Sequence, residues 1–382
     1  MARCLNDRYK GSKQLELRYG HRALFVDPDS RRVFVRSAEG DELYLPYDLL
    51  IGADGVRSVV RAAMVASHRD FECHVEDIFE RFKALHIDLP EGVEPDCMHV
   101  FPSCMRNMNG IGLVCTGGRI NISMGHRLHA PCDEALRSED PAVVAEYFKK
   151  NFKAIPLPYD EVAQKWVAQG WNSTTMTHCN YYHSERLQAV IMGDAAHATS
   201  PSIGMGMNHA LGDAAALDQL LEKHNDHLSP VLRDFSSERV KEGNALTDVA
   251  DLIQSYDGSQ GLFMMIRQAL RGMGHSLLPS LVAPEPYMAI GNGMKLSDAY
   301  AELVRMGRIP AVRRTNAAIK RRHFEQTTGM VPPQTRPSRG WLITAVAVAV
   351  MASGCWMLRS SSAPPTPTPV PTSVALKRFG IF

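Results

Sequence analysis

Two short apolar runs, each ending at an aspartate beside a glycine, constrain the fold of this 382-residue chain more than any other feature. Residues 47–61 read YDLLIGADGVRSVVR, and residues 190–217 read VIMGDAAHATSPSIGMGMNHALGDAAAL. The runs at 49–53 and 189–192 are apolar without alternation, which is typical of strands buried on both faces. Open α/β sheets bind ligands outside the carboxyl ends of such strands. The polar residues that follow each run are therefore candidates for a ligand site.

The second junction also predicts an anion site. The Gly-Met-Gly run at 204–206 allows the backbone to approach a ligand closely, and Met207 and Asn208 open a predicted helix. The free N–H groups and positive dipole end of a helix suit a diphosphate or a reduced flavin. Asp194 is expected to accept hydrogen bonds from ribityl or ribose hydroxyls. Each feature has a structural alternative, since such an aspartate is often a helix cap and such methionines often fill a core.

Taken together, the two junctions resemble the two downstream fingerprints of class A flavoprotein monooxygenases, the family similar to p-hydroxybenzoate hydroxylase. Within it, GDAAHATSPSIGMGMN and NFKAIPL (residues 151–157) resemble segments of the kynurenine 3-monooxygenases. The resemblance covers roughly residues 15 to 358. It implies FAD and NAD(P)H as cofactors and the hydroxylation of a small, kynurenine-like aromatic substrate with O2. The predicted cofactor contacts are Asp54, Gly55, Arg57, Gly193, Asp194, Pro201, Gly204, Gly206, Met207 and Asn208.

The resemblance suggests one substrate contact and no catalytic acid or base. Tyr300, in the segment YAELV, occupies a place like a tyrosine of the family's substrate pocket, and a structural aromatic is the alternative. An asparagine expected near Tyr256 or Gln260 is not clearly matched, which leaves kynurenine itself open. Because the cofactor carries the chemistry, the catalytic residues stay unassigned. The eight cysteines form no CxxC pair, and no metal site is predicted.

The strand, GxGxxG turn and helix with which the family begins have no counterpart in the sequence. Gly110-Ile-Gly112, Gly272-Met-Gly274 and Gly291-Asn-Gly293 lack the third glycine and the βαβ setting. The sequence is therefore either a truncated form or a decayed or repurposed relative. Truncation is favoured, because both retained fingerprints are intact and the remainder would expose an edge of its sheet.

The predicted fold class is α/β, with an incomplete Rossmann-like FAD-binding domain, an antiparallel substrate-domain sheet, C-terminal helices and one transmembrane helix. The expected boundaries are 1–70 and 181–225 for the two parts of the FAD-binding domain, 71–180 for the substrate-domain sheet, 226–335 for the helical region, 340–358 for the transmembrane helix and 359–382 for a disordered tail.

The transmembrane prediction rests on residues 340–358, GWLITAVAVAVMASGCWML, which carry no charge and would span about 30 Å as a helix. Trp341 and Trp356 lie near the two ends, and a basic stretch at 305–322 precedes the run. This pattern predicts a single-pass C-terminal anchor in a lipid bilayer, with the large domain in the cytosol. The outer mitochondrial membrane is implied by the resemblance alone. A net charge of +1 argues against a nucleic-acid partner.

Two other functions fit the same residues. One is a membrane-associated flavin-dependent epoxidase or isoprenoid reductase, which would be separated by substrate competition. The other is a non-catalytic, tail-anchored relative that has lost its flavin and serves as an interaction surface. The flavin content of the purified protein distinguishes that reading from both enzymes.

Overall fold

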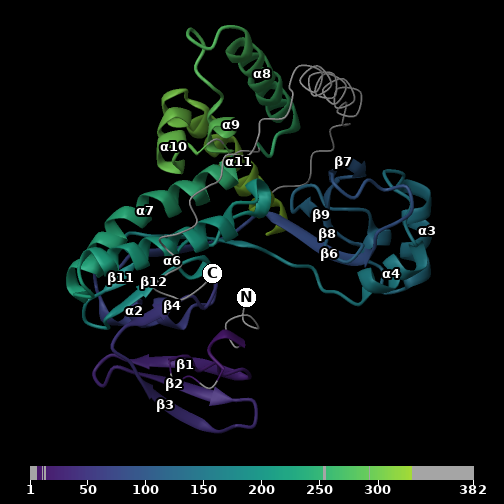
Figure 1. Cartoon of the computed structure of the whole chain (residues 1–382). Coiled ribbons are helices and arrows are strands. Elements are labelled where there is room, and N and C mark those ends of the chain that lie inside the picture. The colour runs from purple at the N-terminus through teal and green to yellow at the C-terminus, as the bar shows by residue number, and fades with distance from the viewer. Residues whose placement is uncertain (1–6, 11, 13, 253–254, 292, 329–382) are drawn as a thin grey trace. The chain divides into compact units, whose positions relative to one another are not determined.

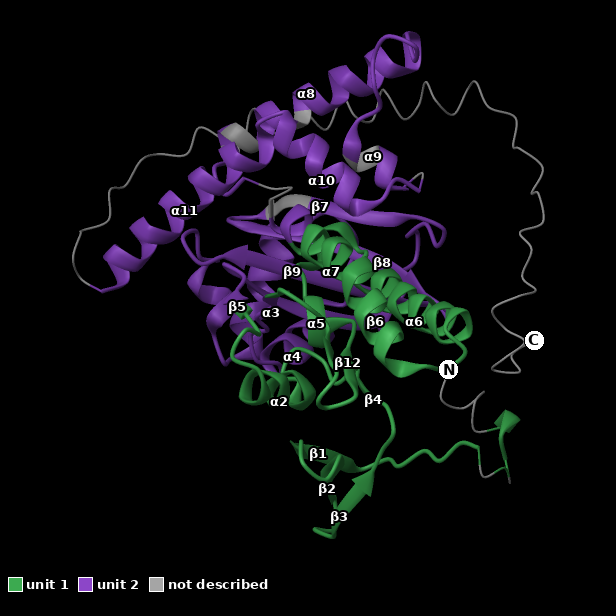
Figure 2. Ribbon diagram, turned by 90° about the vertical axis from the view of Figure 1, so that its left-hand side faces the viewer, with its two compact units in different colours: residues 1–75, 177–247, 370–382 green, residues 76–176, 248–369 purple. Residues whose placement is uncertain are grey.

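The computed structural model describes residues 7–10, 12, 14–252, 255–291 and 293–328, and they form two compact units (Figure 2). Unit 1 is built from described residues within 1–75 and 177–247. Unit 2 is built from those within 76–176 and 248–328. The domain boundaries expected from the sequence stay a prediction.

Unit 1 contains an antiparallel meander with strand order β1-β2-β3. Its strands are β1 (His21–Asp27), β2 (Arg32–Ser37) and β3 (Glu42–Pro46). The turn after β1 is fixed locally, because the Asp27 carboxylate accepts hydrogen bonds from the Asp29 N–H (3.0 Å) and from the Ser30 hydroxyl (2.5 Å). Aspartate in this position replaces a backbone acceptor and favours a tight reversal.

A second sheet of unit 1, with strand order β11-β12-β4, carries both predicted junctions (Figure 1). Its strands are β4 (Leu50–Gly52), β11 (His183–Ser184) and β12 (Ala189–Ile191). The helices of this unit are α2 (Val59–Ser67), α5 (Asp194–His197), the 3-10 helix η2 (Pro201–Ile203), α6 (Gly206–Lys223) and α7 (Leu228–Leu252), of which the residues up to Thr247 belong to unit 1. All three residues of β12 are fully buried, as expected, whereas Ile51 on β4 is 46% exposed because β4 is the outer strand of the described sheet.

Two further strands, β5 (Cys73–Asp77) and β10 (Thr175–Cys179), form a separate two-stranded sheet. Cys73 and Cys179, at one end of this sheet, both belong to unit 1.

Unit 2 is built on a four-stranded antiparallel sheet with strand order β6-β9-β8-β7. The strands are β6 (Glu80–Asp88), β7 (Met98–Met105), β8 (Met108–Cys115) and β9 (Arg119–Arg127). The short helix η1 (Glu134–Arg137), α3 (Pro141–Asn151) and α4 (Tyr159–Val167) belong to the same core, in which Leu85, Ile122, Phe148 and Trp166 are fully buried. Its remaining helices are α8 (Gly258–Leu277), α9 (Pro286–Gly291), α10 (Leu296–Arg305) and α11 (Arg308–Thr327).

Two of the three Gly-x-Gly pairs considered as dinucleotide turns lie in other settings, and the third includes residue 292, which is outside the described residues. Gly110 and Gly112 are inside the antiparallel strand β8, where an added Cβ would lie 2.8 Å and 3.0 Å, respectively, from the side chains of β9. Gly272 and Gly274 are inside helix α8. These glycines serve close packing or helix structure, and neither pair forms a turn between a strand and a helix.

The predicted membrane anchor has to be corrected. Among the residues that the structure describes, no helix is both long and apolar enough to cross a bilayer. The three longest of these helices, α7, α8 and α11, all carry charged side chains, which are costly in hydrocarbon. Residues 340–358 and the tail at 359–382 lie outside the described residues. The single-pass anchor, the bilayer as a partner and the membrane location are therefore withdrawn.

Candidate cofactor-binding site

The two predicted junctions meet at one edge of the sheet. Strands β4 and β12 pair in parallel, with Leu50 opposite Ala189 and Gly52 opposite Ile191. Since parallel strands point the same way, Asp54 and Asp194, which follow β4 and β12, emerge at the same edge of the sheet. This edge is where open α/β sheets place their ligands.

The first junction serves helix α2. The Asp54 carboxylate accepts hydrogen bonds from the N–H groups of Val59 (2.6 Å) and Val60 (3.4 Å), and the Ser58 hydroxyl accepts one from Arg61 (2.9 Å). The Asp54 side chain thus satisfies the first N–H groups of α2 from outside the helix, whose N-cap residue is Ser58. The roles of Asp54, Gly55 and Arg57 as cofactor contacts stay a prediction; Gly55 has φ of 77° and Arg57 is exposed.

The second junction presents one acidic side chain in the largely buried segment 193–198, the cofactor loop, which contains the short helix α5. Asp194 is the single exposed residue between Ala189 and Ala198. The preceding Gly193 has φ of 57°, and a Cβ added there would lie 3.1 Å from the Cβ of Ala210 on α6. Glycine therefore lets the loop run close to the helix with the Asp194 carboxylate turned outward.

The N-terminus of helix α6 follows within the same segment. Gly204 has φ of 65° and ends η2, and α6 begins at Gly206 with no capping side chain and no acidic residue in its first turn. Met207 is 73% exposed, and Asn208 and Pro201 are also exposed. The first N–H groups of this 18-residue helix thus lack a side-chain acceptor. Such a helix N-terminus favours the binding of an anionic group.

A buried carboxylate on α6 holds this loop in place. Asp213, fully buried, accepts hydrogen bonds from the Gly193 N–H (2.9 Å), the His197 ring (2.7 Å) and the Arg239 guanidinium (2.6 Å). Burial raises the pKa of Asp213, but the hydrogen bond and the charge of His197, together with Gly193 and Arg239, outweigh it and leave the pKa below its ordinary value. The carboxylate is therefore charged and fully used in positioning the loop.

Arg61 links the two junctions directly. Its buried guanidinium donates to the Val56 carbonyl (2.5 Å) in the first junction and to the Ala195 carbonyl (2.6 Å) in the second. A planar guanidinium can reach two acceptors at once, which a lysine cannot reproduce.

Sequence reasoning did not select Arg61, Asp213 or Arg239. A signal was present for two of them. Arg61 lies on the buried stripe of α2 with Val60 and Met64, and Asp213 lies on that of α6 with the apolar Leu217 and Leu220. A charge on an otherwise apolar helix face must find a partner when it is buried.

Acidification is expected to destabilise unit 1 through His209 on α6. Burial, the Arg239 guanidinium and His197 lower the pKa of His209 to about 4 from an ordinary value of 6.5. Between these values the unfolded chain takes up a proton that the folded chain does not, so the stability contribution is lost as the pH falls from 6.5 toward 4. His209→Gln should lose less stability over this range, measured as the urea midpoint at about pH 7 and about pH 5. Equal losses in both proteins would contradict the assignment.

Tyr300, the predicted substrate contact, lies on α10 in unit 2. Burial and the nearby Asp248 raise its pKa, and its hydroxyl hydrogen-bonds with Asp248 and Arg313. Arg313 also pairs with Asp248 at 3.2 Å. These contacts fit a structural aromatic, and the substrate role stays a prediction.

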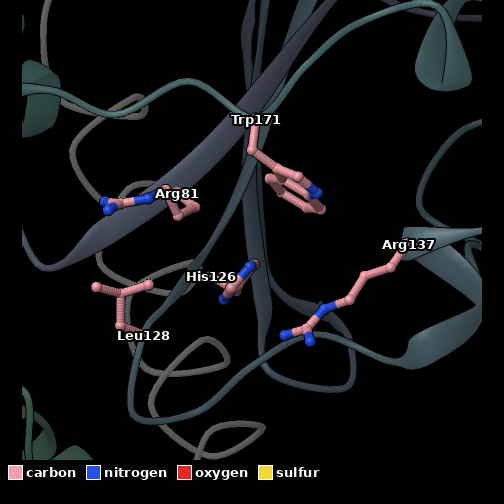
Figure 3. A pocket seen from close by; sticks show the side chains of 5 residues that line it. All are labelled: Arg81, His126, Leu128, Arg137 and Trp171. Atoms are coloured by element: carbon pink, nitrogen blue, oxygen red, sulfur yellow. The ribbon is translucent and has the colours of Figure 1, made fainter. Parts of the chain in front are cut away.

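Unit 2 also contains a pocket of about 400 Å³, which none of the predicted site residues lines (Figure 3). The Arg137 side chain reaches from η1 toward His126 on β9, next to Trp171. Arg81 is held there by the Asp77 carboxylate at 2.8 and 3.0 Å. Burial, Arg137 and Arg81 lower the pKa of His126. The residues that line this pocket make it basic and partly aromatic.

The fold and the site of unit 1 define an α/β protein with a strand-end loop suited to a dinucleotide cofactor. A family model described as the FAD binding domain matches residues 3–250. The chain therefore belongs to the FAD binding domain family. Its relatives include kynurenine 3-monooxygenases, which agrees with the class A FAD-dependent aromatic monooxygenase that the two fingerprints indicated.

Two relatives and one solved structure illustrate these similarities. Violacein synthase of Chromobacterium violaceum is 29% identical over 294 residues, which cover 74% of this chain and 66% of that protein. Kynurenine 3-monooxygenase of Sus scrofa is 25% identical over 285 residues, covering 73% of this chain and 58% of that protein. Klebsiella pneumoniae HpxO in complex with FAD and uric acid is 20% identical, with a TM-score of 0.45 over 61% of this chain and 57% of that chain. The chain thus spans less than two thirds of the length of these relatives.

Proposed function

We propose that this chain is part of an FAD-dependent monooxygenase that hydroxylates a small aromatic, kynurenine-like substrate with NAD(P)H and O2. The observation that carries the proposal is the parallel pairing of β4 with β12, which brings both fingerprints to one sheet edge beside the uncapped N-terminus of α6. The FAD binding domain match and the printed names of the kynurenine 3-monooxygenase relatives support it.

The residues at this edge fit the chemistry of FAD. The exposed Asp194 carboxylate is an acceptor for sugar or ribityl hydroxyls, and the backbone N–H groups at Gly206, Met207 and Asn208 suit an anionic group. When bound, FAD would take electrons from NAD(P)H and use O2 to deliver one oxygen atom to the ring. The side chains of the chain bind and orient, and no acid or base is assigned to the transfer.

Loss of the Asp194 carboxylate is expected to weaken FAD binding by about tenfold to a hundredfold, because a hydrogen bond to a charged group contributes about 1.5–3 kcal/mol. The measurement is a titration of flavin fluorescence with wild type and Asp194→Ala. Asp88→Ala is a matched control, because Asp88 is an exposed aspartate on β6 of unit 2. This variant should bind FAD with the affinity of wild type. An Asp194→Ala protein that binds FAD as tightly as wild type would remove this residue from the proposed site.

The substrate is tested separately from the cofactor. Protein reconstituted with FAD should oxidise NAD(P)H faster when L-kynurenine is present and should form a hydroxylated product that mass spectrometry detects. A flavin-bound protein whose oxidation rate does not respond to kynurenine would leave the cofactor assignment intact and overturn the substrate. A folded protein that binds no FAD would overturn both.

A further inference from the structure

Two cysteines lie opposite each other in unit 1, in a place that the cofactor site does not use. Cys73 is the first residue of β5 and is partly exposed, whereas Cys179 is the last residue of β10 and is 2% exposed. Both thiols are free, and they hydrogen-bond to each other.

The strand register fixes this juxtaposition. The Asn180 N–H donates to the Glu72 carbonyl (3.1 Å), and the Ile78 N–H donates to the Thr174 carbonyl (2.9 Å). From Glu72 to Ile78 along β5, the hydrogen-bonded partner moves from Asn180 back to Thr174 along β10, by the same number of residues. The two strands are therefore antiparallel, with no net β-bulge between these pairs. The two cysteines, each one position inside the first of these pairs, are therefore directly opposed.

The cysteine pair also has the spacing of a disulfide. Hydrogen-bonded and non-hydrogen-bonded pairs alternate along an antiparallel ladder, and the neighbouring pair of Glu72 with Asn180 is hydrogen-bonded. The cysteines therefore form a non-hydrogen-bonded pair, in which Cα atoms are about 4.5 Å apart. Disulfides accept Cα separations from about 4.4 to 6.8 Å. A bridge can form with little movement of the backbone.

The surroundings give the two thiols different roles. The hydrogen bond from Cys179 lowers the pKa of Cys73 to about 7, against the opposing effect of burial and with help from Arg61 and His178. The same hydrogen bond and burial raise the pKa of Cys179. Cys73, which is accessible and partly a thiolate at neutral pH, is the nucleophile, and Cys179 is the buried resolving thiol.

We propose that Cys73 and Cys179 form a peroxide-responsive thiol–disulfide switch. The Cys73 sulfur attacks hydrogen peroxide, the O–O bond breaks, and Cys73 becomes a sulfenic acid while hydroxide leaves. The Cys179 sulfur then displaces the sulfenic hydroxyl, which leaves as water with the thiol proton, and an S–S bond forms. Two thiols and one peroxide thus give one disulfide and two waters.

The switch lies close to the cofactor loop. Arg61, whose charge favours the Cys73 thiolate, also donates to the Ala195 carbonyl. Two residues before Cys179, the Thr177 N–H donates to the Ala198 carbonyl at 2.9 Å. Formation of the disulfide removes the negative charge of the Cys73 thiolate near Arg61. It also links β10 covalently to β5, and β10 is the strand that contacts Ala198 at the end of the cofactor loop.

The test treats the reduced, folded full chain with hydrogen peroxide, blocks remaining thiols by alkylation and maps peptides without reductant by mass spectrometry. The expected result is a linked peptide containing Cys73 and Cys179, lighter by two hydrogen atoms than the sum of its parts and released by dithiothreitol. The bridge should persist in Cys115→Ser, which changes an exposed cysteine of unit 2, and should not form in urea.

Two variants make the test decisive. In Cys179→Ser, Cys73 should accumulate as a sulfenic acid that dimedone captures, and in Cys73→Ser, Cys179 should stay reduced. The proposal is overturned if peroxide oxidises Cys97 or Cys115 while Cys73 and Cys179 both remain thiols, or if Cys73 links to a different cysteine.

Discussion

Replacing Asp213 by alanine is expected to lower the free energy of unfolding by about 3–5 kcal/mol, the usual cost of removing one partner from a buried ion pair. The carboxylate is fully buried and accepts from Gly193, His197 and Arg239. Its removal leaves a guanidinium that is 15% exposed and a backbone N–H without their acceptor. Urea unfolding followed by circular dichroism measures the effect.

Two variants calibrate this result. Asp213→Asn keeps an acceptor for the Gly193 N–H and loses the charge, so it should fall between wild type and alanine. Asp234→Ala, which removes a surface carboxylate paired with Lys223 and His224, should change stability much less. If Asp213→Ala unfolded at the same urea concentration as wild type, the carboxylate would not hold the loop.

Gly243→Ala on α7 is expected to destabilise the protein by about 1–3 kcal/mol, because the added methyl enters a packed core. A Cβ at this position would overlap the Tyr182 hydroxyl and would lie 2.7 Å from the His197 ring. Tyr182 and His197 are 0% and 1% exposed, so neither side chain can move away from the added methyl without displacing other buried atoms. Since His197 belongs to the loop after β12, FAD affinity should fall together with stability.

The same substitution elsewhere should have the opposite sign. At Gly272 in α8 an added Cβ meets no atom within 4 Å, so Gly272→Ala should stabilise by about 0.5–1 kcal/mol through the lower helix cost of alanine. Differential scanning calorimetry of both variants gives the comparison. A stabilised Gly243→Ala would show that α7 does not approach His197 as closely as the structure indicates.

The sequence predicted well what depends on neighbouring residues. The turn at Asp27 and the strand ahead of Gly193 follow from local turn chemistry and from an uninterrupted apolar run, and the structure contains both. The FAD relationship followed in the same way, because each fingerprint is a contiguous segment and the family match confirms it.

Roles that depend on distant partners were harder to predict. The sequence predicts Asp54 as a cofactor contact, whereas the structure shows its carboxylate bound to the first N–H groups of α2. Arg61 and Asp213 were missed because their partners lie on other elements, at Ala195 and Arg239. The apolar run at 340–358 satisfied a length and charge rule, but no described helix supports the anchor inferred from it.

The parallel pairing of β4 with β12 has a consequence for the order in which the protein is made. It joins residues 139 positions apart, and the whole segment 76–176 of unit 2 is translated between the two strands. The ribosome therefore releases the first fingerprint long before the second, and Arg239 later still. Contacts of such high sequence separation form slowly, so the cofactor edge is completed only after most of the chain has emerged.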